Sequence, residues 1–322
     1  MFDWTQLNTA ATTTPTSAKS WQCAIPLLDH VLIEVKGPDA EKFLQGQCTC
    51  DFKSIANGKF SLGAHCNVKG RMVSSFTAAK LGPEHFGLRT HKSNAEKALA
   101  TLKKYAVFSK VSLEISSSLA AVAVFNTQAN EVPFFNATAE VGCSTALEQG
   151  ACLAHTNSMQ ELWLARENIQ QLLEQLPVAA PHYWTAYNIA QGVAEVTADS
   201  TEQLIPQEIN LQLLGGVSFN KGCYTGQEIV ARMHYKATLK KHMYRAQLAP
   251  STSAPATGTA LINEEGKNVG QVVQSVTTDA GAQILALTLD TAAHSKNVHC
   301  EANPQQKLQW LALPYAIPLT EN

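Results

Sequence analysis

The 322-residue sequence lacks the features that assign a protein to a membrane or to the outside of the cell. It has no apolar run near the ~20 residues that a membrane-spanning helix needs. Its first residues, Met-Phe-Asp-Trp-Thr-Gln, lack the basic start and apolar centre of a signal peptide. We therefore expect a cytoplasmic protein with no membrane segment.

Charge and metal-binding patterns are also scarce. Charged residues make up 16% of the chain and the net charge is −2, which argues against a surface that coats nucleic acid but leaves room for a local basic patch. No pair of cysteines has the two-residue spacing of a zinc or cluster motif, since Cys48 and Cys50 are separated by one residue. We expect no metal site and reduced thiols. The eight cysteines are Cys23, Cys48, Cys50, Cys66, Cys143, Cys152, Cys223 and Cys300.

What the sequence does contain predicts an α+β protein of two or three domains. Hydrophobic residues make up 45%, enough for a sizeable core. Strand-like and helix-like segments alternate over residues 25–115, and the same style returns over 116–180, which predicts two α+β units. Short strands with turns after residue 239 predict a small β-barrel or sandwich. We expect a flexible tail (1–20), an α+β region of two subdomains (21–238) and a C-terminal barrel (239–322).

Local signals place several elements within these regions. Gly37-Pro38-Asp39 opens a predicted helix whose buried face is Ala40, Phe43 and Leu44. Asn57-Gly58 predicts a hairpin turn. Ser93 and Glu96 have the spacing of a capping box, so a helix over 94–105 that buries Tyr105 is expected, followed by a strand over 107–115.

The most informative stretch is 206–235, centred on Lys221-Gly222-Cys223-Tyr224-Thr225-Gly226-Gln227-Glu228. A short strand (217–219), a glycine loop and a helix starting at a Thr225–Glu228 capping box are expected. Backbone N–H groups at such a helix start favour an anion and lower the pKa of a thiol. Cys223 is therefore a candidate catalytic or redox thiol, with Lys221 favouring the thiolate. A tight turn with a cysteine that merely packs carries equal weight.

This octapeptide, with Phe219-Asn220 before it and Ile229-Val230-Ala231-Arg232 after it, resembles the signature of the YgfZ family. These are folate-binding, tRNA-modifying proteins linked to the maintenance of iron–sulfur enzymes and related to the aminomethyltransferase (T-protein) of the glycine cleavage system. Segments 37–51, 63–72 and 101–111 are also similar, and the resemblance spans roughly residues 25–315. It implies a T-protein-like fold, with two α+β units around a central folate cavity and a C-terminal barrel.

The resemblance implies that tetrahydrofolate or a derivative binds non-covalently. Trp184 matches a family tryptophan that contacts folate, and an indole can stack on a pterin ring; a core tryptophan is the alternative. His30 stands where the family often has a second tryptophan. Arg71, from the hairpin tip that also carries Lys69, either faces the ligand cavity or is a solvated charge. The cofactor-binding residues expected from the resemblance are Trp184, His30, Arg71, Tyr224, Gln227 and Arg232.

Two departures from the family pattern bear on chemistry. Ala190 stands where the family usually has a glutamate, so another acceptor for the pterin is needed, such as Glu195 or the backbone. T-proteins supply a catalytic aspartate from a pair that Ser74 and Ser75 replace here. Aminomethyl transfer needs a carboxylate for the protonated amine, so the loss disfavours that reaction.

The leading hypothesis is a folate-binding protein that supports iron–sulfur cluster assembly or repair, and thereby tRNA modification, with Cys223 as its functional thiol. Its partners would be iron–sulfur enzymes or assembly factors, and we expect a monomer. The alternatives are an aminomethyltransferase-like enzyme and a non-catalytic folate-sensing scaffold. A weak tRNA contact through Lys236, Lys240, Lys241 and Arg245 is a further hypothesis, against which stands a solvated basic turn.

Overall fold

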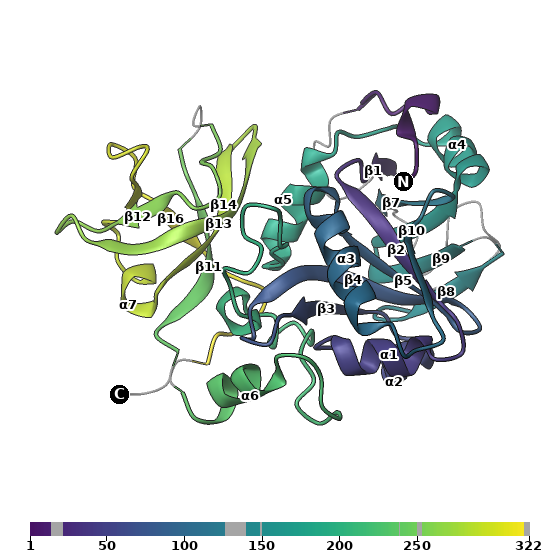
Figure 1. The fold of residues 1–322 in the computed structure, drawn as a ribbon. Coiled ribbons are helices and arrows are strands. Elements are labelled where there is room, and N and C mark those ends of the chain that lie inside the picture. The colour runs from purple at the N-terminus through teal and green to yellow at the C-terminus, as the bar shows by residue number, and fades with distance from the viewer. Residues whose placement is uncertain (14–21, 126–139, 149, 238, 250–252, 319–322) are drawn as a thin grey trace.

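Three antiparallel sheets, each with its own hydrophobic core, lie side by side in the computed structural model (Figure 1). The structure describes residues 1–13, 22–125, 140–148, 150–237, 239–249 and 253–318. In this part of the chain no helix is long and apolar enough to cross a membrane. Each of the eight cysteines is a free thiol.

The first sheet has the strand order β3-β4-β5-β2-β6 and is covered by three helices. Helix α1 buries Ala40, Phe43 and Leu44 against it, as predicted. The strands are β2 (His30–Lys36), β3 (Ser61–Cys66), β4 (Met72–Gly82), β5 (His85–His91) and β6 (Ser112–Ile115). The helices are α1 (Ala40–Gln47), α2 (Phe52–Ala56) and α3 (Ala95–Tyr105), the last preceded by the 3-10 turn η2 (Lys92–Asn94).

The second sheet has the order β1-β7-β10-β9-β8, so the first strand of the chain joins the second sheet. Its strands are β1 (Cys23–Pro26), β7 (Leu119–Phe125), β8 (Ser144–Leu147), β9 (Gly150–Thr156) and β10 (Met159–Ala165), followed by helix α4 (Arg166–Gln175). Before β1, the 3-10 turn η1 (Trp4–Gln6) lets Phe2 and Leu7 pack into the core of this sheet. Residues 1–13 of the expected flexible tail are therefore docked, and 14–20 lie outside the described residues.

The third sheet curls into a half-barrel with the order β15-β12-β13-β14-β11-β16. The expected barrel is thus an open curled sheet, with β15 and β16 at its edges. Helix α5 (His182–Gln191) lies between this sheet and the other two (Figure 1) and contacts β13 and β14. The elements are η3 (Pro206–Ile209), α6 (Gln227–Tyr235), β11 (Lys241–Gln247), β12 (Ala260–Ile262), β13 (Asn268–Thr278), β14 (Gly281–Leu289), α7 (Asp290–Ala293), β15 (His299–Cys300) and β16 (Gln309–Leu311).

Both predicted capping boxes are wrong, because the capping residues bond elsewhere. Helix α6 starts at Gln227 after Gly226, and the Thr225 hydroxyl donates to Gln47 Oε1 at 3.0 Å. Helix α3 starts at Ala95 without a side-chain cap, and the Ser93 hydroxyl oxygen accepts from the Ala198 N–H at 3.1 Å.

Three other local predictions differ from the structure. Residues 217–219 are not a strand. Asn57-Gly58 follows α2, and the hairpin of β3 and β4 turns at 67–71 instead. The strand expected over 107–115 begins at Ser112, because the Lys110 N–H is held by Asp39 at 2.7 Å and the preceding loop turns outward. Tyr105 is consequently exposed, together with Val107 and Phe108.

Candidate functional site

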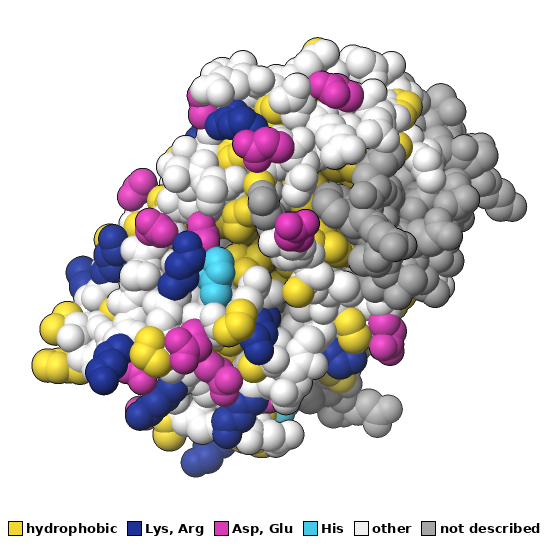
Figure 2. All heavy atoms as spheres, turned by 90° about the vertical axis from the view of Figure 1, so that its right-hand side faces the viewer, with side chains coloured by type: hydrophobic (Ala, Val, Ile, Leu, Met, Phe, Trp, Pro, Cys, Tyr) yellow, Lys and Arg dark blue, Asp and Glu magenta, His cyan; other side chains and the backbone are white. Residues whose placement is uncertain are grey.

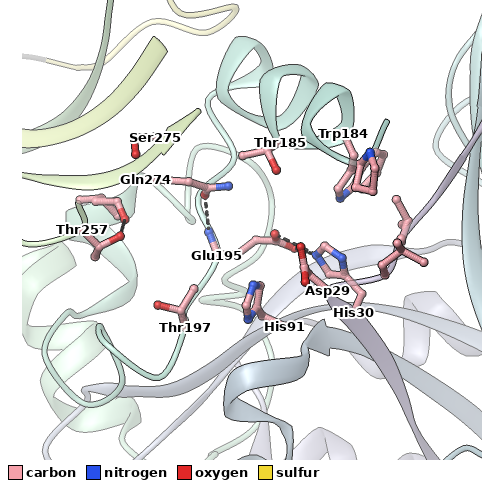
Figure 3. A pocket seen from close by; sticks show the side chains of 14 residues that line it. Asp29, His30, His91, Trp184, Thr185, Glu195, Thr197, Thr257, Gln274 and Ser275 are labelled. Carbon is pink, nitrogen blue, oxygen red and sulfur yellow. Dashed lines mark hydrogen bonds and ion pairs between the residues drawn. The ribbon is translucent and has the colours of Figure 1, made fainter. Parts of the chain in front are cut away.

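A cavity of about 210 Å³ lies where the three sheets meet (Figure 3). Its walls come from the turn before β2, the end of β5, the first half of α5, the segment after α5 and strand β13. His30, Trp184 and Glu195 line it together with Asp29 and His91. We call this cavity the Trp184 pocket. It brings together residues that lie more than 150 positions apart in the sequence.

Glu195 is fixed in the wall by three neighbours. His30 Nε2 lies 2.9 Å from Oε1 and 3.0 Å from Oε2 of Glu195, and Arg89 Nη1 donates to Oε1 at 2.8 Å. The Glu195 backbone N–H donates to Gln274 Oε1 at 3.0 Å (Figure 3). Because a carboxylate only accepts, His30 donates from Nε2, and its Nδ1 is an acceptor while the ring is neutral.

Arg89 connects this wall to a second buried carboxylate. Its Nε lies 2.5 Å from Glu161 Oε1, and its Nη2 donates to Thr77 at 2.7 Å. Burial alone would raise the pKa of both carboxyls, but Arg89 and the neighbouring histidines outweigh it. They lower the pKa of Glu161 to about 2 and hold that of Glu195 well below its usual range. Both groups are therefore ionised at neutral pH.

Three polar atoms of residues that line the Trp184 pocket have no hydrogen-bond partner in the described part of the chain. They are Nδ1 of His30, Nε1 of Trp184 and Oγ1 of Thr197, all buried. Buried polar atoms are normally hydrogen-bonded, so each such atom beside a cavity calls for an explanation. Here a ligand can supply one acceptor and one donor.

The Trp184 ring itself is a wall rather than a free stacking surface. It is 2% exposed. The Arg89 guanidinium carbon lies 5.2 Å from its ring centroid, and Tyr187 stacks on it at 5.7 Å. The stacking on a pterin ring that the resemblance implies for Trp184 stays a prediction.

A second cavity, of about 450 Å³, lies behind the same charged residues. It is lined by Arg89 and His155, while Glu195 lines the first. His155 Nε2 is 3.1 Å from Glu161 Oε2, so the ion pairs of Arg89 separate the two cavities. The central folate cavity that the resemblance implies stays a prediction; Glu195 lines the Trp184 pocket and Arg89 lines the second cavity.

The signature loop is anchored by Lys221. Its Nζ donates to the carbonyl oxygens of Cys48 and Cys50 at 2.7 Å each, in the connection between α1 and α2. It also lies 5.1 Å from the centroid of the Tyr224 ring, which is buried. Burial lowers the pKa of Lys221. Lys221 therefore anchors the loop through these contacts. Cys223, in the same loop, is exposed.

Two glycines let the loop and the β3–β4 hairpin pack closely. Gly226 has φ +84°, and a Cβ there would lie 2.5 Å from the Asn67 carbonyl oxygen. A Cβ on Gly70 would lie 2.8 Å from Ile229. Gly226 and Gly70 thus allow the hairpin to pack closely against the start of α6.

The structure divides the predicted site residues between two places. His30 and Trp184 share the pocket, with their rings edge to face at 6.5 Å. Lys221, Cys223, Tyr224 and Gln227 belong to the signature loop and the start of α6. Arg71 is exposed on the hairpin and its guanidinium donates to the Gln203 carbonyl, and Arg232 is exposed on α6.

Cys223 is not among the residues that line the Trp184 pocket or the second cavity. Its loop is instead anchored by Lys221 to the connection between α1 and α2. Sequence reasoning also missed Arg89, Glu161 and His155. The available signal was a charged residue next to a short apolar run in two strands, Phe86-Gly87-Leu88-Arg89 and Glu161-Leu162-Trp163-Leu164.

The chain is similar to known proteins over most of its length. The family model described as the GCVT N-terminal domain matches residues 29–136. "tRNA-modifying protein YgfZ" of Yersinia enterocolitica is 33% identical over 308 residues, which cover 91% of this chain and 92% of the relative. The protein of the same name from Photorhabdus laumondii is 37% identical over 264 residues, 78% of this chain and 79% of the relative.

A solved structure shows the same fold. The glycine cleavage system aminomethyltransferase T from Bartonella henselae superposes with a TM-score of 0.73 at 16% identity, covering 92% of this chain and 87% of that one. At this identity the similarity concerns the fold and not the reaction. On the sequence identities and their coverage, the chain belongs to the family of YgfZ tRNA-modifying proteins, built on the aminomethyltransferase fold.

Proposed function

We propose that the protein binds a reduced folate with its pterin ring in the Trp184 pocket, and that it supports iron–sulfur enzymes, including enzymes that modify tRNA. The observation that supports the folate part is that His30 Nδ1 and Trp184 Nε1, two of the three unpartnered atoms of the pocket lining, are one acceptor and one donor. The indole N–H only donates, and the neutral imidazole accepts. A pterin presents a ring carbonyl next to a ring N–H, so one edge of it satisfies both atoms.

The size and charge of the pocket favour the pterin end of the molecule. A cavity of about 210 Å³ suits a fused bicyclic ring and not a whole folate. Asp29 and the ionised Glu195 line it, and these negative charges repel the glutamate tail. The tail therefore stays outside while the uncharged ring enters.

Glu195 takes over only part of the role of the missing glutamate at Ala190. Its carboxylate faces the pocket, but His30 and Arg89 already occupy its oxygens. Glu195 accepts from Nε2 of His30, which leaves Nδ1 as the acceptor in the neutral ring. It is thus a positioning residue, and His30 is the residue that meets the ligand.

Aminomethyl transfer has less support. Ser75 Oγ accepts a hydrogen bond from the Val196 N–H at 2.8 Å, so this serine ties the segment after α5 to β4. Ser74 is buried. Neither serine can carry the charge that the protonated amine of that reaction needs. In the proposed function, the exposed thiol of Cys223 acts instead on a partner protein at the surface.

Titration of 5-formyltetrahydrofolate into the purified protein, followed by calorimetry, tests the folate proposal. Trp184→Phe removes one N–H donor and keeps an aromatic ring, so the Kd should rise about fivefold, which corresponds to the ~1 kcal/mol of one hydrogen bond. Trp310→Phe is the matched control, because Trp310 Nε1 donates to the Ser295 carbonyl in the C-terminal sheet. No binding by the wild type, or equal Kd values for wild type and Trp184→Phe, would overturn the proposal.

A further inference from the structure

The segment from Ile209 to Asn263 is strongly basic within an acidic chain. It contains six lysines and arginines and a single acidic residue, Glu228, so it carries a net charge of +5. The whole chain carries −2. Such asymmetry on a folded protein concentrates positive potential on one part of the surface and attracts polyanions.

The cations at the end of α6 and the start of β11 are free to meet a ligand. Arg232, Lys236, Lys240 and Lys241 are exposed, and among the described residues none of the four forms an ion pair. Some other surface lysines are paired, as Lys97 is with Glu202 at 2.7 Å. The face in Figure 2 likewise shows basic and acidic side chains next to one another.

An aromatic group lies at the end of α6, the helix that carries Arg232 and is followed by Lys236. The rings of Phe219 and His234 are stacked, with centroids 3.7 Å apart and an interplanar angle of 12°. Tyr235 meets both rings edge-on, at 5.9 Å and 4.6 Å, and is 66% exposed. Phe219 is partly buried against the core, so it anchors the three stacked and edge-on rings. His234 and Tyr235 are exposed.

We propose that this surface, which we call the α6–β11 surface (Phe219, Arg232, His234, Tyr235, Lys236, Lys240 and Lys241), binds a single-stranded segment of RNA. The four cations contact backbone phosphates, and a base stacks on the exposed ring of Tyr235 or His234. Proteins that bind single strands combine these two features, and each stacked base contributes ~1–3 kcal/mol. The proposal is independent of folate binding, because none of these residues lines the Trp184 pocket.

The aromatic group favours RNA over the other polyanionic partners. An acidic protein surface would pair with the cations, but it would not stack on the exposed aromatic rings. A duplex hides its base faces inside the helix, so it too would be held through its charges alone. Helix α6 runs from the signature loop to this surface, and its nine residues span ~13 Å. A bound strand would lie about that far from the Cys223 loop.

Fluorescence anisotropy with a labelled RNA 12-mer, single-stranded or annealed to its complement, tests the proposal. The wild type should bind the single strand more tightly than the duplex. Tyr235→Ala should raise the Kd for the single strand at least fivefold and leave the Kd for the duplex unchanged. The double variant Lys240→Glu/Lys241→Glu should lower the salt slope by about 1.4, taking ~0.7 per phosphate contact.

Lys103→Glu/Lys104→Glu on α3 is the matched control, since both lysines are exposed and neither forms an ion pair with a described residue. It should bind as the wild type does. Three outcomes would overturn the proposal: no binding by the wild type at 50 mM salt, an equal loss in the α3 variant, or a Tyr235→Ala protein that still prefers the single strand. Melting curves by circular dichroism exclude variants that are unfolded.

Discussion

Arg89 is the residue on which the wall between the two cavities depends. It is buried together with Glu161 and also pairs with the partly buried Glu195, and removing one partner from such a cluster leaves an uncompensated charge. Burial of an ion pair does not by itself stabilise a protein, because desolvation offsets the attraction. The wall is therefore best understood as a device that holds His30 and Trp184 in place rather than as a source of stability.

The first prediction concerns Arg89→Met. The variant should lose about 3–5 kcal/mol of folding free energy at pH 7, because two ionised carboxylates remain without their guanidinium. In the wild type, both carboxyls have depressed pKa values, so their contribution is fully present above the unfolded pKa of ~4.3 and is lost as the pH falls toward about 2. In the variant, burial raises these pKa values, so its stability should increase as the pH falls from 8 to 5.

Thermal unfolding between pH 5 and pH 8 measures this difference. Lys97→Met is the control, because its exposed pair with Glu202 should contribute less than about 1 kcal/mol at any pH in the window. Stability curves for Arg89→Met and wild type that run parallel across this range would contradict the assigned role.

At the scale of elements, the sequence correctly predicted features that follow from hydrophobic periodicity. It gave wrong predictions where tertiary contacts compete with local hydrogen bonds. The buried face of α1 follows its apolar pattern and appears as expected. The capping boxes did not form, because Thr225 and Ser93 found partners that are distant in sequence. Spacing alone reports which bonds a residue can make, and not which of them the fold uses.

The signature loop offers the second prediction, on paired glycines. Gly226→Ala should destabilise the protein by about 1–3 kcal/mol, because the residue has φ +84° and its new Cβ would meet the Asn67 carbonyl oxygen. Gly222→Ala, four residues earlier, should change the stability by less than about 0.5 kcal/mol, because no atom lies within 4 Å of its Cβ position and its φ is not positive. Urea unfolding of both variants checks this. Equal losses would show that the loop does not pack on the hairpin as described.

At the scale of the whole molecule, the resemblance of the sequence to a family predicted the fold but not the distribution of its special residues. The signature loop is contiguous, so it can be recognised in the sequence. The residues of the Trp184 pocket are not contiguous. His30 and Glu195 are separated by 165 positions and meet only when the second half of the chain returns to β2. For the same reason Arg89 and Glu161, from two different sheets, could not be paired in advance.

The separation of pocket and thiol leads to the last prediction. If the two places are distinct, Cys223→Ala should bind 5-formyltetrahydrofolate with a Kd within twofold of the wild type, since its side chain lines neither cavity. In a bacterial strain lacking its own relative of this protein, the same variant should fail to restore the modified nucleosides made by iron–sulfur enzymes. Cys143→Ser, which changes a partly exposed thiol elsewhere, should restore them fully.

A tenfold weaker folate affinity of Cys223→Ala would place thiol and pterin in one site. Full restoration by Cys223→Ser would reduce the protein to a folate-sensing scaffold, because an oxygen at this position keeps the shape of the loop and removes the chemistry of the thiolate.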